Sequence, residues 1–138
     1  MMKWNVVIAL LLVAAGNAMA TETVVNERQA SYREAGAGNF DAARGESMWS
    51  RQQMHAEMGQ SVSCATCHSG NLSTVGKHIR TGKLIDPMAP SMNAERLTDA
   101  AKIEKWFTRN CKWTWGRECT AQEKGDFLQF IFNPNNRR

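Results

Sequence analysis

The sequence is poor in β-strand signals. No stretch alternates apolar and polar residues as a half-buried strand does, and no internal repeat is present. The three prolines, Pro87, Pro90 and Pro134, fall in an expected loop or at the expected end of a helix. Most of the apolar residues recur at helical spacing instead. We therefore expect an all-α protein with one small domain.

Basic runs interleaved with aromatic residues are also missing. The chain has 17 Lys and Arg against 13 Asp and Glu, a formal net charge of +4. Its only adjacent pair of basic residues, Arg137 and Arg138, forms the C-terminal tail. Recognition of nucleic acid needs a concentrated basic surface, so we expect no nucleic-acid partner.

No apolar run is long enough to span a bilayer. The longest runs from Val6 to Ala15, and Ala18-Met19-Ala20 follows it as the small-x-small triplet that signal peptidase cuts. We expect residues 1–20 to be a cleaved signal peptide and residues 21–138 to be a single periplasmic domain, with no membrane attachment in the mature form. A retained anchor, the rival interpretation, needs an apolar stretch about twice as long.

A five-residue motif points to a cofactor. Cys64-Ala65-Thr66-Cys67-His68 has the C-x-x-C-H pattern, in which two thiols one helical turn apart form thioethers with haem and the adjoining imidazole reaches the iron. We predict one covalent haem c, attached through Cys64 and Cys67 with His68 as an iron ligand. The fold class is then a small class I cytochrome c-like helical domain.

Two other uses of the motif each lack a required feature. A thioredoxin-like redox pair needs a βαβ scaffold, and no β-branched strand precedes Cys64. A zinc ribbon needs a second close cysteine pair, whereas Cys111 and Cys119 stand eight positions apart. These two cysteines are left to pair with each other in an oxidising compartment. The disulfide would close a short loop directly after Asn110 and contribute roughly 2 to 3 kcal/mol.

Capping signals mark three helices. Asp41 can cap a helix that runs to about Gln53, and Thr120-Ala121-Gln122-Glu123 is a capping box for a final helix that stops at Pro134. Their apolar stripes should face each other, and we pair Gly45 of the first helix with Phe130 of the last. Asp99 or Thr98 can cap the helix between them. Its inward face should hold Ile103, Trp106, Phe107 and Asn110. An earlier helix is expected near residues 25–35, ending at Gly36.

The segment from Asn71 to Asn93 has little periodicity and should wrap the haem as an irregular loop. Arg80, Lys83 and His78 could meet the haem propionates there, because charge-assisted donors suit partly buried carboxylates. Solvated surface charges are the alternative for Arg80 and Lys83.

The sixth iron ligand decides between functions. A methionine on this loop would favour ferrous iron and make a simple electron carrier. Met88 and Met92 are both suitably placed by sequence order, with core packing as the alternative role, and we favour Met88. His55 and His78 are further candidates, whereas Met54 and Met58 look like residues of a helix face.

Beyond these patterns, residues 40–132 resemble the sphaeroides haem protein family, which are small high-spin class I c-type cytochromes that bind oxygen. The resemblance rests on four stretches: Cys64–His68, Arg80-Thr81-Gly82-Lys83, residues 104–111 with Arg109-Asn110-Cys111, and Gly116-Arg117-Glu118-Cys119-Thr120. It implies that Asn110 is the sixth ligand, that Cys111 and Cys119 are bonded, and that Asn110 leaves the iron on reduction so that O2, NO or CO can bind. It also implies a dihaem c-type cytochrome as electron partner. A sister group similar to cytochrome c double-prime has histidine at the asparagine position.

The chemistry agrees with the resemblance, because an amide oxygen is a hard donor that suits ferric iron better than ferrous iron. Two functions therefore remain open, a reduction-gated gas-binding protein and a Met88-ligated electron carrier. The sequence has no dedicated acid–base pair, which favours both over an enzyme. Asn110 as a mere helix C-cap is the structural alternative to ligation.

Overall fold

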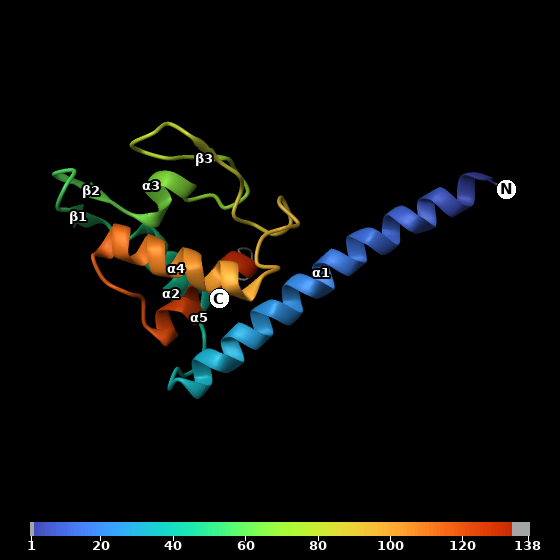
Figure 1. Cartoon of the computed structure of the whole chain (residues 1–138), viewed down its shortest axis with the longest axis horizontal. Coiled ribbons are helices and arrows are strands. Elements are labelled where there is room, and N and C mark those ends of the chain that lie inside the picture. The colour runs from blue at the N-terminus through green and yellow to red at the C-terminus, as the bar shows by residue number, and fades with distance from the viewer. Residues whose placement is uncertain (1, 134–138) are drawn as a thin grey trace.

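The computed structural model describes residues 2–133, with side chains from Gly16 onward. Its elements in chain order are α1 (Met2–Glu34), α2 (Ala42–Ser50), β1 (Gln53–His55), β2 (Gln60–Val62), α3 (Cys64–His68), β3 (Gly76–Lys77), β4 (Leu84–Ile85), α4 (Ala100–Trp115) and α5 (Ala121–Phe132). Helices build the core and the strands form two small hairpins (Figure 1). The expected all-α class is confirmed.

The C-terminal half of α1 packs against the body, whereas its N-terminal half projects away from it (Figure 1). Val25 and Tyr32 are buried with Ile103 of α4 and Leu128 of α5. Gly36, with φ of +96°, follows the end of α1, so the helix expected near residues 25–35 is confirmed within a longer one. Among the residues whose side chains are described, no helix is both long and apolar enough to cross a membrane.

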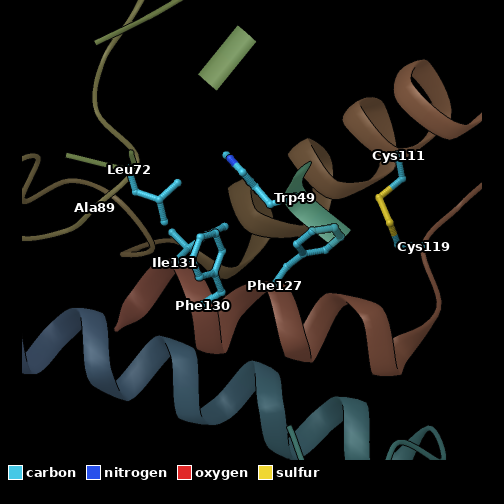
Figure 2. Packing of buried hydrophobic residues seen from close by; sticks show 8 residues of the cluster. All are labelled: Trp49, Leu72, Ala89, Cys111, Cys119, Phe127, Phe130 and Ile131. Atoms are coloured by element: carbon cyan, nitrogen blue, oxygen red, sulfur yellow. A yellow bond between two sulfur atoms is a disulfide. The ribbon is translucent and has the colours of Figure 1, made fainter. Parts of the chain in front are cut away.

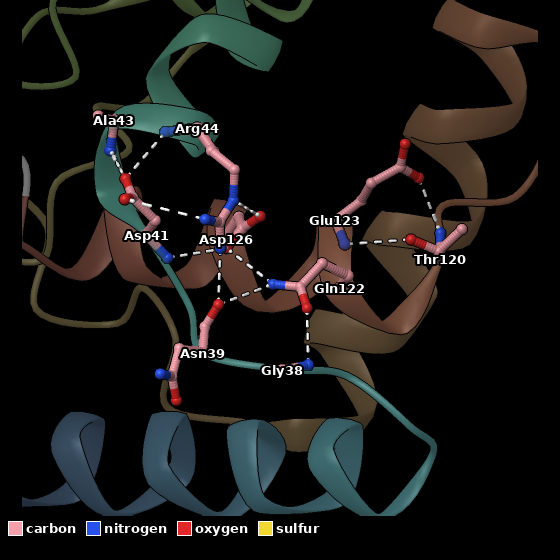
Figure 3. Close-up of polar contacts among 9 residues, drawn as sticks. All are labelled: Gly38, Asn39, Asp41, Ala43, Arg44, Thr120, Gln122, Glu123 and Asp126. Atoms are coloured by element: carbon pink, nitrogen blue, oxygen red, sulfur yellow. Dashed lines mark hydrogen bonds and ion pairs between the residues drawn. The ribbon is translucent and has the colours of Figure 1, made fainter.

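Helices α2 and α5 cross at the expected glycine. A Cβ atom at Gly45 would lie 2.3 Å from the carbonyl oxygen of Asp126 and 2.8 Å from the Cβ of Phe130. The pairing of Gly45 with Phe130 is therefore confirmed, and only glycine permits so close an approach of the two axes. Beside the crossing, the buried carboxylate of Asp126 accepts hydrogen bonds from the Asp41 backbone and from the Arg44 side chain (Figure 3).

The expected caps of the three helices are also present. The Asp41 side chain accepts from the backbone of Ala43 and Arg44, and that of Asp99 accepts from the Lys102 backbone. Thr120 and Glu123 form the capping box of α5 (Figure 3). Helix α5 ends at Phe132, and Pro134 lies outside the described residues.

Four details correct the sequence expectations. Helix α2 ends at Ser50 rather than near Gln53, because Arg51 turns to an extended backbone that leads into β1. Met54 and His55 therefore lie in a strand and not on a helix, with Met58 in the turn that follows. The strands escaped prediction because two or three residues are too few to show alternation.

Trp106 is the third correction, because its side chain is 48% exposed. Successive residues of a helix are rotated by about 100° around its axis. The inner face of α4 is therefore centred near Phe107, between the buried residues Ile103, Cys111 and Thr114. Trp106 falls well outside that face. Asn110 falls at its edge and is exposed, so its expected burial is also wrong.

The main core cluster lies between α2, α4 and α5 and the segment after α3. The rings of Phe127 and Phe130 of α5 pack edge-on against Trp49 of α2. The cluster also contains Ile131, Leu72, Ala89, Cys111 and Cys119 (Figure 2). This cluster joins the motif helix α3 to the rest of the fold, because partly buried Cys64 and Ala65 pack against it.

Candidate functional site

Helix α3 consists of the C-x-x-C-H motif alone. Ser63 precedes it in an extended conformation, and its backbone N–H donates to the Thr66 hydroxyl at 2.8 Å. Cys64 is half-buried and Cys67 is buried, and neither is in a disulfide. Burial raises the pKa of the Cys64 thiol to about 11. Both thiols therefore stand one helical turn apart on a short, locally capped helix.

His68 ends this helix in a largely apolar setting. Its ring lies 5.6 Å from that of Trp49, measured between centroids. Burial, followed by the charges of Arg96 and His78, lowers the pKa of His68 to about 4. The imidazole is therefore neutral at physiological pH, which is the form that binds metals.

Trp49 is the support that sequence reasoning missed. Its indole N–H donates to the Ser69 carbonyl at 2.8 Å, and Ser69 has a φ of +68°. Positive φ is unfavourable for serine, so the bond helps hold the chain in the reversal that follows His68. The rings of Phe127 and Phe130 lie 6.2 and 6.0 Å from that of Trp49. In the sequence its only signal is its helical spacing from Gly45, which indicates a core position.

The segment after α3 folds back onto the motif. A Cβ at Gly76 would lie 2.2 Å from the Cys67 carbonyl oxygen, so only glycine fits there. The Ile79 backbone N–H points to the Cys67 sulfur at 3.4 Å. The irregular loop expected at residues 71–93 does lie against the motif, with the hairpin of β3 and β4 inside it.

Asn110 lies within α4, on the helix whose Phe107 packs 6.1 Å from Phe127. The side chain of Asn110 is exposed and has no hydrogen bond in the described chain. Directly after it, Cys111 is bonded to Cys119 with a Cα–Cα distance of 5.7 Å. Trp49 and Phe127 thus link the rings of His68 and Phe107, and through them the motif and the helix of Asn110.

Known proteins resemble this chain in sequence and in fold. The chain is 39% identical to cytochrome c-type protein SHP of Cereibacter sphaeroides over 122 residues, 88% of this chain and 93% of that one. A family model described as domain of unknown function DUF1924 matches residues 35–131. The structure of oxidized SHP, described as an oxygen binding cytochrome c, matches with a TM-score of 0.70 and 37% identity, covering 78% of this chain and 95% of that one.

The chain belongs to the SHP family of c-type cytochromes. A further SHP-like fold is the solution structure of cytochrome c'' from Methylophilus methylotrophus, which matches with a TM-score of 0.69 and 30% identity, covering 86% of this chain and 96% of that one. That structure is described as giving insight into haem-ligand detachment.

The cofactor of an SHP-family protein is one covalently attached haem, and the residues present fit it. Cys64 and Cys67 are the two cysteines outside the disulfide, and they would hold the haem through thioethers. The neutral imidazole of His68 would bind the iron. The haem supplies an iron that changes oxidation state.

The other candidates for the sixth iron ligand of this SHP-family chain lie in different surroundings. Met88 is half-buried and packs against the main core cluster, and Met92 is 58% exposed. His55 lies in β1 and His78 directly follows β3. The centroids of their rings lie 4.5 and 6.2 Å from that of Trp113, which stands about one helical turn after Asn110 on α4. Arg80 and Lys83 are exposed between β3 and β4.

Proposed function

We propose that this chain is an exported, reduction-gated gas-binding cytochrome. Asn110 and His68 would both hold the ferric iron, and Asn110 would be released on reduction, so that the site becomes available to O2, NO or CO. The electron comes from another haem protein, for which the family resemblance suggests a dihaem c-type cytochrome. The protein then acts as an electron-transfer and gas-binding protein and not as a dedicated enzyme.

The placement of Asn110 supports this proposal most directly. Helix α4 continues to Trp115 and ends at Gly116, which has a φ of +70°, so Asn110 is not a helix cap. Asparagine is a poor helix former. The side chain of Asn110 forms no hydrogen bond and is not buried, so no such interaction offsets this cost. A ligand role accounts for a residue that contributes nothing to the helix that contains it.

The chemistry of the amide supports the gating. Its oxygen is a hard, neutral donor, which suits ferric iron and holds the softer ferrous ion poorly. The released amide keeps an N–H donor near the iron, and distal donors govern the binding of diatomic gases. The names of the relatives agree, because one is an oxygen binding cytochrome and the other undergoes haem-ligand detachment.

The neighbouring disulfide fits the same site, and the cations of the loop after the motif have a separate role. The disulfide between Cys111 and Cys119 would restrain the turn that follows Asn110 and keep the released side chain near the iron. Arg80 and Lys83 are exposed and have no acidic partner in the part of the chain that the structure describes. We propose that they are solvated surface charges rather than partners of the haem propionates.

A Met88-ligated electron carrier is the competing function. Met88 packs against the cluster that contains Leu72 and Ala89, where its side chain fills core space. The Ala89 backbone N–H donates to the Leu72 carbonyl at 2.9 Å and fixes the loop in this position. A packing role accounts for Met88, so the observations favour Asn110.

Absorption spectra of both oxidation states, with and without CO, test the proposal. Asn110→Ala should keep covalent haem, make the ferric iron five-coordinate or water-ligated, and speed ferric ligand binding. CO binding to the reduced variant should stay largely unchanged, because Asn110 has already left. Asn110→His should lower the affinity of the reduced protein for CO, because imidazole holds ferrous iron better than an amide does.

Two control variants sharpen this experiment. Arg109→Ala, an exposed neighbour on α4, should leave the ferric spectrum unchanged. Met88→Ala should change stability but not iron ligation. If Met88→Ala alters the ferric spectrum and Asn110→Ala does not, the protein is a Met-ligated carrier and gas binding is abandoned.

A further inference from the structure

The hairpin that covers the motif, residues 75–84 with β3 and β4, differs from the rest of the surface in charge. All 13 acidic residues lie at or before Glu57 or at or after Asp86. The stretch between them contains α3, β3 and β4, and three cations follow one another there at exposed positions: Lys77, Arg80 and Lys83. None of the three forms an ion pair with the described part of the chain.

The same hairpin exposes apolar side chains. Val75 is 54% exposed, Ile79 36% and Leu84 68%. Elsewhere in the described chain the large exposed apolar residues, Met19, Met54, Met92 and Trp106, are spread over four separate segments. Apolar side chains flanked by like charges mark a protein-binding surface, since the apolar part supplies affinity and the charges select an oppositely charged partner.

This surface adjoins the cofactor attachment point. Gly76 packs on the Cys67 carbonyl, and the Ile79 backbone N–H reaches the Cys67 sulfur. In Figure 1 the segment with β3 stands beside α3 at the edge of the molecule, away from α1. A partner docked here would be close to a haem attached at Cys67. The rate of electron tunnelling falls steeply with distance, so this position would favour fast electron transfer.

We propose that this cationic hairpin (residues 75–84) is the docking surface for an electron-donor protein with an acidic face. The inference rests on the proposed function, in which an electron must reach the site before gas binds. One electron passes from the reduced donor protein to the ferric holoprotein, and the donor is oxidised by one electron. The release of Asn110 then follows as in the proposed function.

A protein partner accounts for these observations better than an anionic membrane does. A membrane would use the charge and the apolar side chains, but it would gain nothing from their position beside Cys67. An electron donor needs all three features together, namely the positive field, the apolar contact and the short path to the cofactor.

The test compares two one-electron donors that share the same chemistry. Acidic flavodoxin semiquinone and neutral lumiflavin semiquinone would each reduce the ferric holoprotein in stopped-flow or flash experiments. Lys77→Glu should lower the second-order rate constant with flavodoxin about 3- to 10-fold at about 10 mM salt, because reversing a rim charge slows association. The loss should vanish near 1 M salt, where the Debye length is only about 3 Å. The rate with lumiflavin should not change.

Lys102→Glu is the matched control. Lys102 is also exposed and changes the net charge by the same amount, but it lies in the first turn of α4 near Asp99 and Glu104. It should leave both rates nearly unchanged. Leu84→Gln should lower the flavodoxin rate that persists at high salt, because it removes apolar contact and no charge.

Three results would overturn the proposal. Equal losses in Lys77→Glu and Lys102→Glu would show an effect of net charge alone. Slower reduction by lumiflavin in Lys77→Glu would show damage to the haem site and not to docking. An unchanged flavodoxin rate, with lost binding of Lys77→Glu to phosphatidylglycerol vesicles, would assign the hairpin to a membrane. None of these results bears on whether Asn110 leaves the reduced iron, which the spectra with CO decide separately.

Discussion

Charged side chains between α1, α2, α4 and α5 are paired with one another, whereas the cations of the cationic hairpin have no counter-charge in the described chain. Asp126, 2% exposed, is bonded by Arg44 at 2.9 Å, and Glu104 is bonded by Lys124 at 2.8 Å and by Tyr32. On the other side, the Nδ1 atoms of buried His55 and of His68 have no hydrogen-bond partner. In the helical frame (α1, α2, α4 and α5), Nε of Arg28 and Nε1 of Trp115 are also buried without a hydrogen-bond partner. The two regions therefore differ in charge: the frame pairs its buried carboxylates, and the motif side (residues 53–93) leaves its exposed cations available for a partner.

The largest expected effect falls on the motif side. Replacing Cys64 and Cys67 together by Ala should abolish covalent attachment, because each thiol supplies one thioether. Acid-acetone extraction should then release haem that remains with the protein in the wild type. Haem that stays fully bound to the double variant would remove the basis for assigning these two residues.

The next largest effect should arise in the helical frame. Gly45→Ala places a methyl group 2.3 Å from the Asp126 carbonyl oxygen and should destabilise the fold by about 2 to 3 kcal/mol in urea unfolding. Gly70→Ala is the control, because nothing lies within 4 Å of its Cβ position. Equal stability of the two variants would contradict the close crossing of α2 and α5.

The disulfide lies on the boundary between the helical frame and the motif side. Its contribution to the free energy of unfolding should be comparable to the effect of Gly45→Ala or smaller. Cys111→Ser with Cys119→Ser should lower stability by roughly 2 kcal/mol, because the short loop gains freedom when unfolded. In the mature wild type, neither thiol should react with iodoacetamide before reductant is added. Alkylation of both cysteines without reductant would show that they are not bonded.

The smallest effect concerns an ion pair of the frame. Burial raises the pKa of Glu104, but the hydrogen bonds from Lys124 and Tyr32 outweigh it, so the pKa lies below its ordinary value of 4.5. A carboxyl group with a lowered pKa stabilises the fold above its unfolded pKa, and this stabilisation is lost as pH falls through the folded pKa. Glu104→Gln should therefore cost about 1 kcal/mol at pH 7 and less at pH 3 to 4. A deficit that grows on acidification would contradict the assignment.

The sequence predicted the frame better than the motif side, for a physical reason. Caps such as Asp41, Asp99 and Thr120 act on residues within one helical turn, so their pattern is visible locally. The pairing of Gly45 with Phe130 could be found because one small residue faces one large residue in two recognisable stripes.

On the motif side, by contrast, the decisive contacts join distant segments. The hydrogen bond from Trp49 to Ser69 and the tilted contact between the rings of His55 and Trp113 have no periodic signal in the sequence. The short strands and the exposure of Trp106 and Asn110 depend on which segments cover which face of α4, and that is settled only by the assembled fold. The C-x-x-C-H motif was recognisable because its chemistry needs five adjacent residues.

The close contact of Gly76 with the Cys67 carbonyl has a consequence for the order of assembly. The segment that covers Cys67 follows it in the chain. In the folded chain, Cys67 is only 8% exposed. A thiol so enclosed is accessible to an attaching enzyme only while that segment is still open. We therefore expect attachment to precede closure, and a chain that folds this segment too early should exclude its own cofactor.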